Sequence, residues 1–128
     1  MAGVKGGVMI RFLPFLAAAL LAAPAAAQVV PPPRLTLEHR MLLRCSAAFA
    51  LIAHRQQAGD PEVQQFPPLK ERGGEFFVRA SARVMEEAGL DRAAISDALE
   101  AEARSLLQGG TLTAVMPVCL SVLDASEQ

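Results

Sequence analysis

The sequence contains no tryptophan and no tyrosine, and only four of its six phenylalanines lie beyond the first 27 residues. Any core must therefore be built mainly from leucine, alanine, valine, isoleucine and methionine. Beyond the first 27 residues the chain has ten basic and thirteen acidic residues, a net charge of −3. Binding to nucleic acid or to an anionic membrane surface needs a basic patch, so this balance argues against both.

The first 27 residues have the pattern of a secretory signal peptide. Lys5 and Arg11 are their only charges, residues 12–23 are apolar, and three alanines precede Gln28. A basic, an apolar and a small-residue region in this order predict cleavage after Ala27. An uncut membrane anchor is the alternative, but the apolar segment is shorter than the roughly 20 residues of a membrane span and contains proline.

Three consecutive prolines follow the predicted cleavage site, at residues 31–33. Each lacks a backbone N–H and restrains the residue before it, so this segment is expected to be extended. We therefore expect a signal peptide over residues 1–27, a proline-rich leader over 28–35 and a single helical domain over 36–126.

Cysteine is scarce, since Cys45 and Cys119 are the only two in the chain. In an exported chain such a pair predicts a disulfide. Closing a loop of about 75 residues would stabilise the fold by up to roughly 4 to 4.5 kcal/mol. Two free thiols, a redox-active pair and half of a metal site are the alternatives, although the spacing is unlike a Cys-x-x-Cys motif.

Four segments carry the apolar periodicity of helices. The first is expected to begin at Thr36 and to end near Ala58, with Cys45 at the centre of its apolar face. The others are expected over residues 75–88, 91–108 and 111–125, with N-caps at Asp91 and Thr111 and a left-handed C-cap at Gly89. Four helices with short connections predict an all-α fold, a small four-helix bundle or array stapled by one disulfide.

Two details of these helices follow from single residues. Pro117 cannot donate a backbone hydrogen bond, so it predicts either a kink or a helix that begins at Met116. In the helix expected over residues 75–88, a helical-wheel projection places Phe77 on the apolar face and Phe76 on its flank.

The segment 62–74 is predicted to be a loop, because it contains two prolines and two glycines. Phe66 and Leu69 flank Pro67 and Pro68. In one interpretation the two apolar side chains form a lid over the end of the bundle, and in the other the four residues form a binding loop. The lid is the interpretation that we favour.

Arg44 lies among apolar neighbours in the first helix, and Glu102 lies at the edge of the apolar face of the third. Charged groups in such positions are usually paired. Our hypothesis is that they form a partly buried ion pair that fixes the first helix against the third.

No catalytic, cofactor-binding or metal-binding motif is found in the sequence. His39 and His54 are too far apart on one helix, roughly 22 Å, to bind the same ion. A helix-turn-helix pattern around Gly89 has a mostly acidic second helix, with Asp91, Asp97 and Glu100 beside Arg92, whereas reading DNA needs basic and amide side chains. We therefore expect a protein that is not an enzyme, with no cofactor, no metal and no nucleic-acid partner.

Four stretches carry a resemblance: RCSAAFA from Arg44, FPPL from Phe66, RGGEFFVRA from Arg72 and MPVCL from Met116. Together they resemble a group of small exported alphaproteobacterial proteins with two cysteines and no assigned activity. The resemblance spans nearly all of the expected mature chain and implies no catalytic residues. The general plan is also similar to that of small periplasmic acid-stress chaperones, which are helical and hold one disulfide, an analogy of architecture only.

The sequence therefore predicts an exported periplasmic helical protein with a non-enzymatic binding, stress-protection or interaction role. Its expected partner is a protein or a component of the cell envelope, and its expected contact with the membrane is through the signal peptide before cleavage. Two alternatives stay open. One is an enzyme whose site is assembled from scattered residues, and the other is a protein tethered by an uncleaved N-terminal segment.

Overall fold

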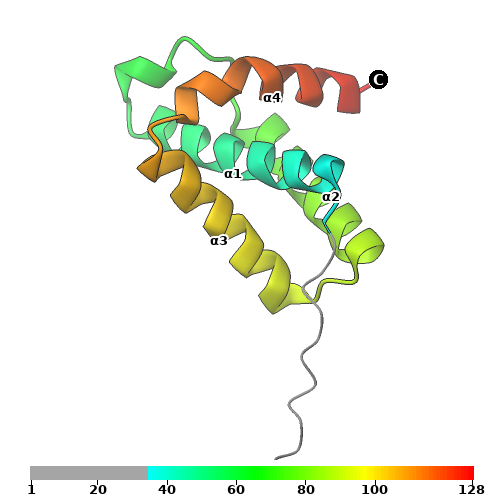
Figure 1. Cartoon of the computed structure of the whole chain (residues 1–128). Helices are drawn as coiled ribbons and strands as arrows, with labels where there is room; N and C mark the ends of the chain where they lie inside the picture. Colours follow the sequence, from blue (N-terminus) through cyan, green and yellow to red (C-terminus); the bar gives the residue numbers. More distant parts are fainter. Residues whose placement is uncertain (1–34) are drawn as a thin grey trace, which may run out of the picture. The chain divides into compact units, whose positions relative to one another are not determined.

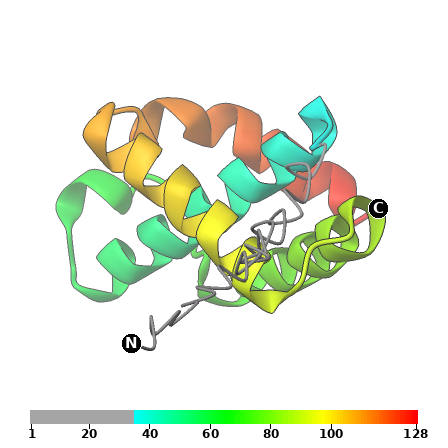
Figure 2. The same ribbon diagram turned by 60° about the horizontal axis from the view of Figure 1, so that its bottom comes forward.

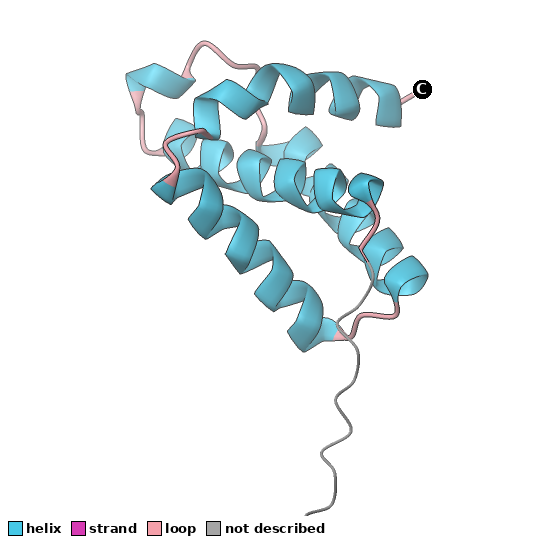
Figure 3. Ribbon diagram, in the orientation of Figure 1, coloured by secondary structure: helices cyan, strands magenta, loops and turns pink. Residues whose placement is uncertain are grey.

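The structure, a computed structural model, describes residues 35–128 and has four α-helices in that range. They are α1 (Leu37–Gln57), α2 (Lys70–Ala88), α3 (Arg92–Gln108) and α4 (Leu112–Ser126), with one 3-10 turn, η1 (Pro61–Val63), between the first two (Figure 1). None of the described residues forms a strand (Figure 3). The expected all-α four-helix fold is confirmed, whereas the predicted signal peptide and nearly all of the predicted leader lie outside the described residues.

Helix α1 is the central element and packs against each of the other three helices. Figure 1 shows α4 along one side of α1 and α3 crossing on the other, and Figure 2 shows the short turn that joins α2 to α3. The middle of α1 is buried on nearly every side, which is the expected state of a helix with so few polar residues.

The predicted caps are present at both kinds of helix end. Thr36 accepts a hydrogen bond from the backbone N–H of His39 at 3.1 Å, and Asp91 accepts one from Ala94 at 2.8 Å. Gly89 closes α2 with φ of 68°, a left-handed conformation that glycine adopts without strain. The side chains of Thr36 and Asp91 satisfy backbone N–H groups that the start of a helix would otherwise leave unpaired.

Helix α4 begins at Leu112, so Pro117 lies inside the helix and the alternative start at Met116 is wrong. Leu112 is buried in the main core, which stabilises the first turn. Pro117 is exposed, and its ring therefore faces solvent rather than a neighbouring helix. The predicted kink at Pro117 stays a prediction, since the start of α4 does not depend on it.

Helix α2 begins at Lys70, five residues before the predicted start, so the predicted loop over 62–74 is too long. Gly73 lies inside the helix, at the point where α2 crosses α1 closely. A Cβ atom at this position would lie 3.0 Å from Cβ of Phe49. The glycine is thus selected by the close approach of two helices rather than by a turn.

The buried phenylalanine of α2 also differs from the expected one. Phe76 is 2% exposed and packs edge-to-face on Phe49, with ring centroids 5.2 Å apart. Phe77 is only half-buried. The expectation that Phe77 lies on the face and Phe76 on the flank is therefore wrong, since Gly73 and Phe76 together extend the buried face by one turn.

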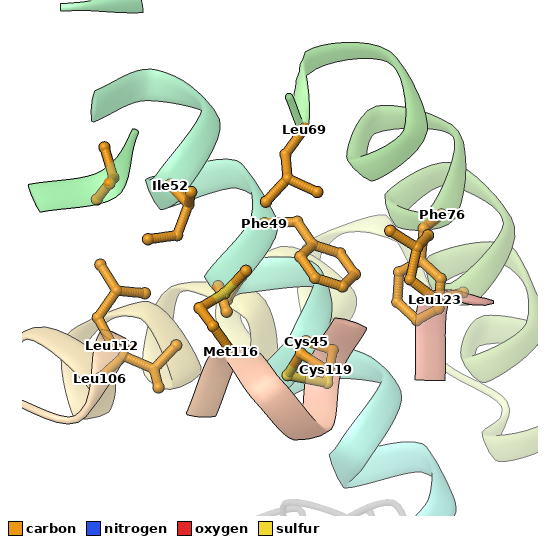
Figure 4. Packing of buried hydrophobic residues seen from close by; sticks show 14 residues of the cluster. Cys45, Phe49, Ile52, Leu69, Phe76, Leu106, Leu112, Met116, Cys119 and Leu123 are labelled. Carbon is orange, nitrogen blue, oxygen red and sulfur yellow. A yellow bond between two sulfur atoms is a disulfide. The ribbon is translucent and has the colours of Figure 1, made fainter. Parts of the chain in front are cut away.

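The Cys45–Cys119 disulfide lies in the middle of the main core and joins α1 to α4 (Figure 4). Both cysteines are buried, and their Cα atoms are 5.2 Å apart. The predicted disulfide is confirmed. A smaller cluster fills the space between α1, α2 and α3, and consists of Leu43, Val84, Leu90 and Ile95.

We expect opposite effects from alanine at the two neighbouring glycines of α2. Gly74→Ala adds a methyl group with no atom within 4 Å, and should raise the free energy of unfolding by about 0.5–1 kcal/mol through helix propensity. Gly73→Ala crowds Phe49 and should lower the free energy of unfolding by about 1–2 kcal/mol. Urea denaturation followed by circular dichroism measures both, and equal effects would contradict the close crossing at Gly73.

Candidate functional site

Arg44 connects three helices. Its Nη1 donates to Oε2 of Glu102 at 3.3 Å, and its Nη2 donates to Oγ1 of Thr111 at 3.4 Å. The side chains of Arg44 and Glu102 are 31% and 26% exposed, so the pair is partly buried, as the sequence suggested. Thr111 is the N-cap residue of α4 as predicted, but its hydroxyl makes no capping bond and accepts from Arg44 instead.

Arg72 joins α2 to the end of α4. Its guanidinium donates to both carboxylate oxygens of Glu127, at 3.0 and 2.7 Å, and to Oδ1 of Asp124 at 2.9 Å. The hydrogen bonds from Arg72 hold the pKa of Glu127 below its usual value. A fork of donors on a planar carboxylate fixes direction as well as distance, so this contact orients the last turn of α4.

Arg83 joins the other end of α2 to the start of α1. It lies 2.9 Å from Oε1 of Glu38 and donates to Oε1 of Glu87 at 2.7 Å. The contact with Glu87 is an i,i+4 pair along α2. Hydrogen bonds from Arg83 and then from His39 lower the pKa of Glu87.

His39 is buried and has a partner on each ring nitrogen. Its Nδ1 accepts from the backbone N–H of Thr36 at 3.3 Å, which assigns the ring proton to Nε2. Nε2 lies 2.8 Å from Oε2 of Glu87 on α2 and donates to it. This role of His39 was not predicted from the sequence. Its signal is the Thr-x-x-His spacing, a capping box with histidine in the usual place of glutamate.

Gln56 holds the connection between α1 and α2 in one conformation. Its Nε2 lies 3.3, 3.3 and 3.0 Å from the carbonyl oxygens of Val63, Phe66 and Pro67, and its Oε1 accepts from the N–H of Leu69 at 3.1 Å. One amide side chain thereby satisfies several backbone groups that no helix or strand would pair. Sequence reasoning missed this residue, because a glutamine near a helix end has no distinctive local pattern.

The predicted loop residues divide into two groups. Leu69 is fully buried in the main core and Phe66 packs against that core, the arrangement that the lid interpretation describes. Pro67 and Pro68 are exposed. These two prolines border a shallow hollow of about 440 Å³ with Lys70, Glu71 and Arg72, so they are the part of the predicted binding loop that a partner could reach.

Asp60 and Arg55 fix the start of this connection. Arg55 donates through Nε to Asp60 at 2.7 Å, and its Nη2 lies 3.0 Å from Glu62. The pKa of Asp60 is lowered, first by the hydrogen bond from the backbone N–H of Glu62 and then by Arg55. The Arg55–Asp60 ion pair therefore fixes the conformation of the chain where the loop begins after α1.

A second hollow, which we call the α2 groove, lies between α1, α2 and the end of α4. It has a volume of about 270 Å³ and is lined by Leu42, Phe76, Arg79, Ala80, Arg83 and Ser126. Apolar side chains form its floor and two arginines of α2 stand at its edge, spaced so that both lie on one side of the helix.

The described residues hold no three histidine, cysteine, aspartate or glutamate side chains close enough together to bind a metal ion. Within residues 35–128 no helix is both long enough and apolar enough to cross a membrane. Comparisons with protein-family models, with curated proteins and with solved structures find no match. The resemblance to small exported alphaproteobacterial proteins therefore stays a prediction.

We expect Arg44→Met and Glu102→Met each to lower the free energy of unfolding by about 1 kcal/mol, because each leaves a half-buried charge without its partner. Arg104→Met is the control, since Arg104 is exposed on α3 and forms no ion pair within the described residues. It should stay within about 0.5 kcal/mol of the wild type. A double-mutant cycle by urea denaturation measures the coupling energy. If both single variants behave like Arg104→Met, this pair does not fix α1 against α3.

Proposed function

We propose that the chain is an exported periplasmic protein with a non-enzymatic binding or stress-protection role toward a protein or an envelope component. The observation that carries the proposal is the buried Cys45–Cys119 disulfide. Disulfides form and persist in oxidising compartments, of which the bacterial periplasm is one. The signal-peptide pattern that ends at Ala27 supports the same compartment.

The composition of the core supports folding after export. The domain has about 90 residues and only four phenylalanines, so its apolar core is small. A domain of this size benefits from a covalent link, and a disulfide that closes a loop this long contributes up to roughly 4 kcal/mol. A reducing compartment would remove that contribution.

The charged groups support a structural rather than a catalytic role for the ion pairs. The carboxylates with lowered pKa values are Asp60, Glu87 and Glu127. Each is bound to an arginine that either joins two helices or lies where the loop after α1 begins. Structural ion pairs perturb pKa values as active sites do, and hydrogen bonds from the backbone and from these arginines account for the shifts here. The α2 groove then offers a surface for binding.

We expect the protein purified from the periplasm to begin at Gln28 and to contain the Cys45–Cys119 disulfide. Intact-mass spectrometry before and after reduction and alkylation measures both. A variant that lacks residues 2–27 is the control, and should remain in the cytoplasm with both thiols open to alkylation. A full-length chain found in the membrane fraction would favour the tethered alternative, and native protein with two reduced cysteines would contradict export.

Acid should loosen the helix ends while the disulfide persists. A carboxyl group with a lower pKa in the folded state binds more protons when the chain unfolds. The stabilisation from Asp60, Glu87 and Glu127 is therefore complete above their ordinary pKa values, near 4, and is lost as the pH falls through the lower folded-state values. The disulfide does not titrate, so α1 and α4 should stay joined.

We therefore expect the protein at about pH 2 to 3 to keep its helical circular dichroism and to bind an apolar dye. Glu127→Gln should reduce the pH dependence of the free energy of unfolding, because it removes one carboxylate whose pKa is lowered by an arginine. Glu75→Gln is the matched control, since Glu75 is exposed and makes no ion pair in the described part of the chain. A rigid protein that binds no dye at this pH would contradict the acid response.

A further inference from the structure

Arg79 is the one arginine of α2 that meets no carboxylate within 4 Å in the described part of the chain. Arg72 and Arg83 each bind two carboxylates. Glu127, which lies near enough to feel the charge of Arg79, has both oxygens held by Arg72. The donors of Arg79 are therefore free to bind a ligand at the edge of the α2 groove.

We propose that the α2 groove binds the C-terminal end of a polypeptide, with the terminal carboxylate on Arg79 and the last apolar side chain on the floor. This inference rests on the binding role proposed above and names the partner's chemistry. The floor consists of Leu42, Phe76 and Ala80, which suits an aliphatic side chain. The free guanidinium suits a single planar carboxylate, which it can bind through two parallel hydrogen bonds.

The size of the groove favours a peptide end over a longer ligand. Its volume, about 270 Å³, is below the roughly 300–1,000 Å³ typical of pockets for drug-sized molecules. One or two residues fill that space. A long acyl chain would leave much of its apolar surface in water, because the groove is an open hollow along α2 and not a tunnel.

Arg83 adds a fixed positive charge to the same edge. It lies four residues after Arg79 on α2, and Glu38 and Glu87 hold its guanidinium in place. Because these two carboxylates hold its guanidinium in place, we assign Arg83 the role of orienting the incoming end through charge. The discriminating contact is thus assigned to Arg79.

The lack of tryptophan and tyrosine in the protein provides a clean assay. The fluorescence anisotropy of the peptide Gly-Ser-Trp-Ala-Leu, excited through its tryptophan, reports binding to the full disulfide-bonded protein without background. We expect the peptide with a free terminal carboxylate to bind about tenfold more tightly than the same peptide with a terminal amide. Arg79→Gln should abolish that difference, while Arg104→Gln, an exposed arginine of α3, should preserve it.

Ser126→Phe tests the place of binding separately, because a larger side chain at this exposed end of the groove should obstruct it and weaken both peptides alike. Equal binding of carboxylate and amide, or a preference that survives Arg79→Gln, would overturn the proposal. Decanoate that displaces the peptide at lower concentration than the free-carboxylate peptide itself would overturn the assignment to a polypeptide end. If the exported, disulfide-bonded protein does not bind the peptide, this inference alone is overturned. Failure of the proposed function would be seen instead in the intact-mass measurement, as an uncleaved chain or as two reduced cysteines.

Discussion

The link between Cys45 and Cys119 is the contact on which the rest of the fold depends. It joins the middle of α4 to the middle of α1, with Cα atoms 5.2 Å apart. Met116 and Leu123 lie about one turn to either side of Cys119, and both are fully buried against the same core. Close-packed interiors tolerate few voids, so the link also sets where these two side chains must fit.

The stabilising contacts are divided between the centre and the ends of the helices. The centre is apolar and covalently linked, whereas Arg72 and Arg83 pair with carboxylates near helix ends. Arg44 pairs with Glu102 between the middle parts of α1 and α3. Partly exposed ion pairs contribute little energy each, but they fix direction. The position of the helix ends is therefore sensitive to pH in a way that the apolar centre is not.

The sequence was sufficient for the number of helices and for most of their ends, because Thr36, Asp91 and Gly89 are local capping signals. It failed at the start of α2. Gly73 and Gly74 read locally as helix breakers, but the structure uses Gly73 to let α1 and α2 approach each other. Tertiary packing outweighs local propensity there. The face of α2 that contains Gly73 and Phe76 is the one that packs on α1, which the sequence pattern placed one residue off.

The disulfide and the Arg44–Glu102 pair could be predicted because each stands out from an apolar background. Contacts of residues that look ordinary in sequence, such as the clamp of Gln56 on the loop, could not. Their partners are set by how the helices cross, and no local pattern records that.

The α2 groove is a consequence of the same crossing. Helix α2 carries three arginines on the side that meets α1 and α4, and the outer two, Arg72 and Arg83, face carboxylates at the ends of those helices. Arg79 lies between them, at the edge of a groove whose floor is apolar and includes Leu42 from α1. No carboxylate in the described part of the chain lies within 4 Å of the Arg79 guanidinium, so its donors stay available above the apolar floor. Arg72 and Arg83 thus orient the helix ends, whereas Arg79 between them is the arginine that we propose recognises a carboxylate from outside the chain.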